Sequence, residues 1–293
     1  MLDFPHAKIN LGLNITRRRP DGYHDIETIF YPIPIADALE VLPWGEDPTS
    51  EPESGDPRTA PTVCARGKCR LFRYGLRVEA PADSDLTVRA YSLLDEAYHL
   101  PPADIHLLKR IPMGAGLGGG SADAAYALKL LNQVFEIGLS IDELEGIAAR
   151  LGADCAFFVE GRPVFAEGIG NVFTPVGHLS LAGYGIMVVK PDVFVSTREA
   201  YASVKPCRPT VSLKEIAQRE PETWRELMVN DFEASIFPRF PEIASIKQRL
   251  YDGGALYASM SGSGSSVYGL FGPGVETPDL DFGSPVFVYK GVL

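Results

Sequence analysis

A glycine-rich loop from Pro112 to Ser121 carries the clearest chemical signal in the 293-residue chain. It holds five glycines, and an apolar stripe with helical spacing follows it at Ala124, Ala127, Leu128, Leu131 and Phe135. Glycines let successive backbone N–H groups approach a ligand closely, and the N-terminus of a helix favours anions. The segment therefore predicts a cradle for phosphate groups, with a nucleotide as the expected ligand.

Three interpretations of this loop compete. A Walker loop ends in Gly-Lys-Ser/Thr, whereas Gly120-Ser121 lacks the lysine. The spacing Gly114-x-Gly116-x-x-Gly119 fits the dinucleotide-binding fingerprint, but that fold needs a strand after the helix, and residues 140–151 have the pattern of a second helix. The third interpretation, a merely flexible loop, does not explain the helical pattern that follows at once.

Two charged residues lie outside this loop at positions that packing does not require. Residues 9–15 alternate as a strand, which places Lys8 and Asn10 together on its polar face. Asp154 follows a predicted helix that begins with the capping box Ser140-x-x-Glu143 and ends at Gly152. From the residues alone, Lys8 is expected to be a solvated surface charge and Asp154 a turn or cap residue.

The composition restricts the functional class. Asp and Glu total 38 against 27 Lys and Arg, giving a formal charge of −11, which disfavours binding to nucleic acid or to an anionic membrane. An anionic substrate then needs locally placed positive groups. With 45% apolar residues, no apolar run of about 18 residues and no signal-peptide core, we expect a soluble cytoplasmic protein, either a monomer or a homodimer. The four cysteines are expected to be free thiols.

The remaining patterns mix strands and helices and predict an α+β class. Residues 17–22 predict the turn of a hairpin, and Asp85 is expected to cap a helix. Further helices are predicted to begin at Ser196-x-x-Glu199 and Ser212-x-x-Glu215. Residues 43–62, which are rich in proline and acidic residues, predict a flexible insertion. We expect two lobes, 1–178 and 179–293.

Four separated segments occur together in this chain: Ala7–Leu11 with Asp21-Gly22-Tyr23-His24, the glycine loop, Leu151–Asp154, and Ser261–Ser266. Their combination resembles the GHMP small-molecule kinases. Within that superfamily, the Tyr23-His24 segment is similar to the kinases of 4-diphosphocytidyl-2-C-methyl-D-erythritol in the non-mevalonate isoprenoid pathway. The resemblance spans residues 6 to about 271, and it implies a two-lobed α+β fold with the active site in the cleft between the lobes.

The resemblance implies ATP-dependent phosphorylation of the 2-hydroxyl of that substrate. Asp154 would accept the proton of the hydroxyl, and Lys8 would keep Asp154 ionised and stabilise charge on the transferring group. Lys109 would reach the nucleotide, and Mg²⁺ is expected with ATP, although no ligand for it can be named. The implied ATP-binding loop comprises Pro112, Met113, Gly114, Ala115, Gly116, Leu117, Gly118, Gly119, Gly120 and Ser121.

The same resemblance implies how the acceptor is held. Tyr23 would stack on the cytosine ring, the backbone of His24 would hydrogen-bond the base, and Asn10 would bind the erythritol portion. Tyr201, shortly after Thr197, would close the other side of the base, and Gly262 would border the cleft. From the residues alone, Tyr23 is expected to be a half-buried packing residue, and Gly262 fits an ordinary hairpin turn as well as a cleft-lining turn.

Two departures from the family pattern are present: the long 43–62 segment, and Asp85 where the family usually has an asparagine near the adenine. Two other functions remain open. One is a GHMP kinase for another small alcohol, such as mevalonate or homoserine, although Tyr23-His24 would then have no base to bind. The other is a nucleotide-binding regulatory protein without catalysis, against which Lys8 and Asp154 both argue.

Overall fold

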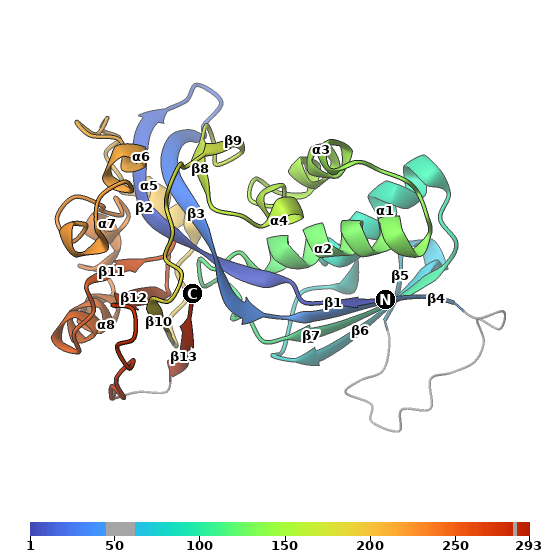
Figure 1. Cartoon of the computed structure of the whole chain (residues 1–293). Helices are drawn as coiled ribbons and strands as arrows, with labels where there is room; N and C mark the ends of the chain where they lie inside the picture. The colour runs from blue at the N-terminus through green and yellow to red at the C-terminus, as the bar shows by residue number, and fades with distance from the viewer. Residues whose placement is uncertain (45–61, 284–285) are drawn as a thin grey trace. The chain divides into compact units, whose positions relative to one another are not determined.

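The computed structural model describes residues 1–44, 62–283 and 286–293 (Figure 1). The predicted 43–62 insertion therefore lies almost wholly outside the described residues. The described chain divides into two compact units. Unit 1 comprises Met1–Ala7, Ile35–Ile111 and Gly119–Gly161, and unit 2 comprises Lys8–Pro34, Pro112–Gly118 and Arg162–Leu293. Residues before position 178 contribute to both units, and the predicted lobes 1–178 and 179–293 stay a prediction.

Unit 1 contains a five-stranded sheet with helices packed on it (Figure 1). The strand order is β1-β4-β7-β6-β5, and only the β6–β7 pair is parallel. The strands are β1 (Leu2–Asp3), β4 (Ala38–Pro43), β5 (Thr62–Cys64), β6 (Cys69–Gly75) and β7 (Ala103–Lys109). The helices are η2 (Ala65–Gly67), η3 (Ala82–Ser84), α1 (Leu86–Tyr98), α2 (Gly119–Val134), α3 (Ile141–Leu151) and α4 (Phe157–Glu160).

Unit 2 is built on two four-stranded sheets, ordered β2-β3-β8-β9 and β11-β12-β10-β13. The first contains β2 (His6–Arg18), β3 (His24–Ala36), β8 (Val164–Glu167) and β9 (Val172–Pro175). The second contains β10 (Gly185–Pro191), β11 (Tyr257–Met260), β12 (Val267–Phe271) and β13 (Val286–Val292). Its helices are α5 (Thr197–Ala202), α6 (Leu213–Ile216), η4 (Pro221–Thr223), α7 (Glu233–Ile236) and α8 (Pro241–Asp252). Both units mix helices and strands, as the α+β class predicts.

The local capping signals have mixed outcomes. The predicted box at the start of α3 is confirmed, because the Ser140 side chain accepts from the Glu143 N–H while the Glu143 carboxylate accepts from the Ser140 N–H at 2.9 Å. The helices predicted to begin at Ser196 and Ser212 are confirmed, because these residues are the N-caps of α5 and α6. Neither forms the Ser-x-x-Glu capping box: Ser212 accepts from the Lys214 N–H, and the Ser196 side chain makes no cap bond. Both helices are short, so a capping box would stabilise few helical residues there.

Strand β2 departs from the alternating pattern of its sequence. Lys8, Asn10 and Asn14, on the face expected to be polar and solvated, are only 3%, 2% and 5% exposed. A buried polar group is tolerated when it finds hydrogen-bond partners. The Asn10 amide donates to Thr28 Oγ1 at 2.9 Å, and Thr28 Oγ1 donates to the Gly12 carbonyl at 2.6 Å. The expectation of a solvated Lys8 is therefore wrong.

Two further sequence expectations can be compared with the described residues. All four cysteines are free thiols, and Cys64, Cys69 and Cys155 are buried. In the described segments we find no helix with both the length and the apolar character needed to cross a bilayer.

Asp85 predicts a measurable stability effect, because its carboxylate accepts from the Thr87 N–H at 3.0 Å and lies 2.9 Å from the Arg73 guanidinium. Asp85→Ala should lower the free energy of unfolding by about 1–2 kcal/mol, the usual range for a lost N-cap. Asp85→Asn, which keeps an oxygen that can cap the helix, should lose less. Denaturant unfolding followed by circular dichroism measures both. Equal losses would assign the effect to the ion pair instead of the cap.

Candidate active site

The backbone of the glycine loop adopts a conformation that requires glycine. Gly114, Gly116 and Gly118 have φ values of +60°, +75° and +73°. A Cβ atom on Gly116 would lie 2.0 Å from the Ser261 carbonyl oxygen. Between the glycines, the side chains of Ala115 and Leu117 are buried. The alternation of glycine with small or apolar residues therefore has a packing reason as well as a conformational one.

Within the described residues, carbonyl groups of this loop accept hydrogen bonds, whereas its N–H groups between Gly114 and Gly118 donate none. Three of its carbonyl groups accept hydrogen bonds from other residues of unit 2. The Ala115 carbonyl accepts from the Ser266 N–H at 3.2 Å, and the Gly116 carbonyl accepts from Ser261 Oγ at 2.8 Å. The Leu117 carbonyl accepts from the Lys8 N–H at 2.9 Å. Within the described chain, the N–H groups of Gly114–Gly118 donate no hydrogen bond. Unpaired backbone donors gathered in one short loop are the donors that a phosphate needs. This arrangement is compatible with the cradle predicted from the sequence, and phosphate binding there stays a prediction.

Helix α2 begins at Gly119, so the last three residues of the loop form its first turn. The segment that contains Asp154 lies near this end of the helix. Cys155, the next residue, is buried, and its thiol is hydrogen-bonded to Ser121 in the first turn of α2. Burial is the main reason that the pKa of Cys155 is raised to about 11; the Asp154 charge adds to the shift, whereas the Ser121 bond opposes it. Asp154 itself is half-buried. In unit 1, the Leu-Gly-Ala-Asp turn is thus fixed beside the N-terminus of α2.

Lys8 and Asn10 lie in a polar cluster of unit 2 that reaches the loop. Lys8 Nζ donates to Asn10 Oδ1 at 2.6 Å and lies 4.7 Å from the centroid of the Phe30 ring. The Asn10 N–H donates to Ser261 Oγ at 3.3 Å, and Ser261 in turn donates to Gly116. Lys8 belongs to unit 2 and Asp154 to unit 1, so the catalytic pairing of the two stays a prediction.

Lys109 occupies a different environment from the one the resemblance implies. Its side chain is 3% exposed, and its ammonium donates to Asp37 and, at 2.6 Å, to Asp123. Burial disfavours the charged ammonium, but the two carboxylates outweigh this effect and raise the pKa of Lys109. Burial raises the pKa of Asp123 well above its usual value, against the opposing charge of Lys109. Both donations go to protein groups, and the predicted reach of Lys109 to the nucleotide stays a prediction.

The residues expected to hold the cytosine lie on the β2–β3 hairpin and on α5, all within unit 2. Tyr23 is 62% exposed, which excludes the packing role expected from its sequence context. The His24 and Tyr201 rings stack with centroids 4.9 Å apart, and Tyr201 also meets Phe232 edge-on at 4.8 Å. Partial burial and the positive charge of Arg18 lower the pKa of His24, which favours the neutral imidazole.

Two other predicted substrate residues are Gly262, which lies in the Ser261–Ser266 segment, and Thr197, which lies beside that segment. Thr197 Oγ1 is 3.2 Å from Ser263 Oγ. Gly262 has a φ of +56°, and a Cβ there would lie 3.3 Å from Asn10 Oδ1, so this turn borders the polar cluster of Lys8 and Asn10. Gly262 thus lies close to Asn10, and its cleft-lining role stays a prediction.

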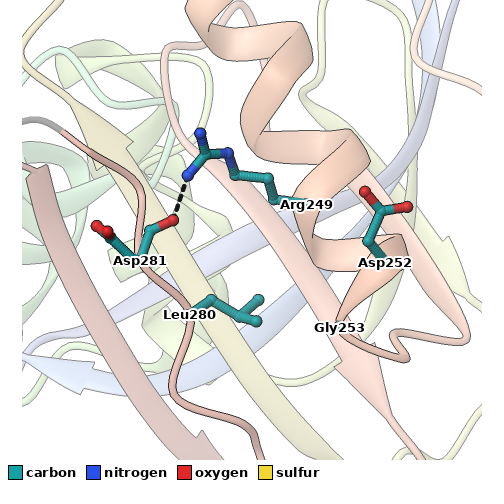
Figure 2. A pocket seen from close by; sticks show the side chains of 5 residues that line it. All are labelled: Arg249, Asp252, Gly253, Leu280 and Asp281. Atoms are coloured by element: carbon teal, nitrogen blue, oxygen red, sulfur yellow. Dashed lines mark hydrogen bonds between the residues drawn. The ribbon is translucent and has the colours of Figure 1, made fainter.

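Sequence reasoning missed Asp37 and Asp123, the carboxylates that surround Lys109. Asp37 precedes β4 and Asp123 lies within α2, and neither belongs to a motif. It also assigned no role to Phe194, whose ring is 71% exposed and would lie 2.8 Å from a Cβ on Gly114. A separate pocket at the C-terminal end of α8 contains none of the predicted site residues (Figure 2). There the Arg249 guanidinium donates to the Asp281 carbonyl.

Comparisons with known proteins identify the family. The model of the GHMP kinase N-terminal domain matches residues 85–162, and that of the GHMP kinase C-terminal domain matches residues 212–279. The 4-diphosphocytidyl-2-C-methyl-D-erythritol kinase of Bacteroides thetaiotaomicron is 54% identical over the whole of both chains. The kinase of the same name from Parabacteroides distasonis is 51% identical, also over the whole of both chains.

Solved structures agree with this result. A crystal structure of 4-(cytidine 5'-diphospho)-2C-methyl-D-erythritol kinase matches with a TM-score of 0.73 and 32% identity, covering 92% of this chain and 90% of that one. Mevalonate kinase from Methanococcus jannaschii shares the fold, with a TM-score of 0.68 at 14% identity over 99% of this chain and 97% of that one. The predicted GHMP kinase fold is confirmed. The chain belongs to the 4-diphosphocytidyl-2-C-methyl-D-erythritol kinase family of the GHMP kinases.

Proposed function

We propose that this protein transfers the γ-phosphoryl group of ATP to the 2-hydroxyl of 4-diphosphocytidyl-2-C-methyl-D-erythritol, within the non-mevalonate route to isoprenoid precursors. Family membership supports the substrate, since the relatives carry that name. The observation that carries the chemistry is the glycine loop, whose carbonyls bind the protein while the N–H groups of Gly114–Gly118 stay available. These donors, followed by the N-terminus of α2, fit the phosphates of ATP.

In the proposed reaction, Asp154 accepts the proton of the 2-hydroxyl as the oxygen attacks the γ-phosphorus. A new P–O bond forms, the bond to the β-phosphate oxygen breaks, and ADP leaves with the negative charge. Lys8 stabilises the charge that develops on the transferring group. Its buried position in the Asn10 cluster supports this role, because burying a cation costs free energy and folding alone gives no reason to place one there.

Acceptor recognition is assigned to the surface around the β2–β3 hairpin. The exposed Tyr23 offers a face on which the cytosine ring can stack, and the backbone of His24 offers hydrogen bonds to the base. Tyr201 is held by stacking on His24, and it closes the site from α5. Asn10 contacts the erythritol portion, and Thr197 and Gly262 complete the acceptor side. A kinase for mevalonate or homoserine would not use this aromatic surface.

Mg²⁺ is proposed to enter with the ATP phosphates, whose charge it neutralises. Over residues 1–44, 62–283 and 286–293, no group of three or more His, Cys, Asp or Glu side chains is placed to hold a metal ion. We therefore name no protein ligand for it. We further propose a cytoplasmic enzyme that acts as a monomer or a homodimer and binds neither nucleic acid nor membrane.

A coupled assay of ADP release over a panel of acceptor alcohols tests this function. The expected result is ATP consumption that depends on 4-diphosphocytidyl-2-C-methyl-D-erythritol, with mevalonate and homoserine giving at least about 10³-fold lower kcat/KM. Comparable activity on a small alcohol would favour a different GHMP kinase. ATP binding without turnover on any acceptor would favour a regulatory protein.

Asp154→Asn should lower kcat by about 10²- to 10⁴-fold, the range for losing a positioned general base. The amide preserves the shape of the side chain, so KM for both substrates should stay within a few fold. Steady-state kinetics with each substrate varied in turn measures this split. A variant with kcat near that of the wild type would remove Asp154 from the mechanism.

Tyr23→Ala should raise KM for the cytidyl substrate by a factor that corresponds to about 1–3 kcal/mol of base stacking, with little change in KM for ATP. Tyr23→Phe keeps the ring and should be nearly neutral. Because Tyr23 is exposed, neither change should shift the melting temperature by more than a few degrees. A parallel rise of both KM values would contradict the stacking role.

A further inference from the structure

A buried ionic network in unit 1 joins Lys109, which the family resemblance places near the nucleotide, to two carboxylates without an assigned role, Asp37 and Asp123. Lys109, at the end of β7, contacts Asp37 and Asp123, and the three side chains are 3%, 0% and 4% exposed. Asp37 precedes β4 and Asp123 lies in the second turn of α2, so the network joins three elements through one ammonium group.

This network surrounds the point where the ATP loop leaves unit 1 and returns to it. Asp37 Oδ1 accepts hydrogen bonds from the N–H groups of Arg110 and Ile111, the two residues that precede the loop. At the other end, a Cβ on Gly119 would lie 2.8 Å from Ile111 Cγ2 and 3.4 Å from Lys109 Nζ. Ile111 and Gly119, the residues on either side of 112–118, therefore lie next to each other and form a narrow neck of the loop. Asp37, Lys109 and Asp123 link the β7 side of this neck to its α2 side.

Stability alone does not account for such a network. Desolvation of buried charges can exceed the attraction between them, and packed apolar side chains often replace them without loss of stability. Here two carboxylates share one ammonium, and Asp123 Oδ1 is buried without a hydrogen-bond partner. This costly arrangement does, however, define the distance between the end of β7 and α2 more narrowly than apolar contacts can.

We propose that Asp37 and Asp123, acting through Lys109, are positioning residues for nucleotide binding that hold the two ends of the ATP loop at a fixed separation. The inference rests on the proposed function, in which the N–H groups of this loop bind phosphate. A site made of backbone donors tolerates shifts of only about 0.5 Å, so loosening the neck weakens phosphate binding without touching the donors themselves.

Asp123→Ala is the decisive variant. It cuts the link to α2, yet it leaves Lys109 paired with Asp37, so no buried cation is left without a partner. Asp123→Asn keeps an oxygen that can accept from Lys109, and it serves as the conservative rescue. The matched control is Asp104→Ala, which breaks the Arg70–Asp104 pair (2.6 Å) between β6 and β7 of the same sheet, with side chains 14% and 13% exposed.

The primary readout is the Kd of a non-hydrolysable ATP analogue, measured by calorimetry on the full chain without acceptor. We expect Kd to rise about tenfold or more in Asp123→Ala, to stay within about threefold in Asp123→Asn, and to stay within about twofold in Asp104→Ala. The KM for the cytidyl substrate should change less than twofold in all three. Melting temperatures measured in parallel report the loss of stability in each variant.

Two results would overturn the proposal. One is an unchanged analogue Kd in folded Asp123→Ala. The other is a rise in Asp104→Ala that matches Asp123→Ala at a similar loss of melting temperature, because that would be a general effect of weakening the sheet. Failure of the proposed function looks different: the wild type would bind the analogue normally and would not phosphorylate the cytidyl substrate.

Discussion

The proposed phosphoryl transfer depends on the orientation of one short stretch of backbone, the glycine loop. For the N–H groups of Gly114–Gly118 to serve an anion, the carbonyl groups of the same loop must point elsewhere and find partners. Ser261, Ser266 and Lys8 supply those partners, and the positive φ at Gly116 makes the reversal possible. A side chain at Gly116 would collide with the Ser261 carbonyl, so the loop cannot keep this shape without glycine.

The polar face of β2 is buried because its residues help to supply hydrogen-bond partners for the carbonyl groups of this loop. Lys8 holds the loop through its backbone N–H and is proposed to serve the reaction through its ammonium. Its neighbour Asn10 accepts from that ammonium, donates to Thr28 and is bound through its backbone to Ser261 and Tyr268. Each buried polar atom in this cluster also positions another one. The desolvation of Lys8 and Asn10 is therefore offset by hydrogen bonds that build the loop and the polar cluster together.

The sequence predicted features whose determinants lie within a few residues of each other. The Ser140–Glu143 box, the Asp85 cap and the helix after the glycine loop are all confirmed, because each depends on local geometry. The alternation of β2 predicted a strand correctly, but not the burial of its polar face, which involves Ser261, 251 positions from Asn10. The environment of Lys109 was likewise not predictable, since Asp37 is 72 positions away and carries no local signal.

A net charge of −11 is compatible with the proposed phosphate cradle. Several of the protein's cations are already neutralised: Lys109 lies between two carboxylates, and Arg17 and Arg19 are paired with Asp25. The proposed cradle would use backbone dipoles at hydrogen-bond distance, where local donors outweigh distant negative charges that salt screens beyond about 8 Å. Because dipoles act only in the right orientation, the proposed site would distinguish phosphates by geometry more than by total charge. The architecture around the loop therefore has to be stiff.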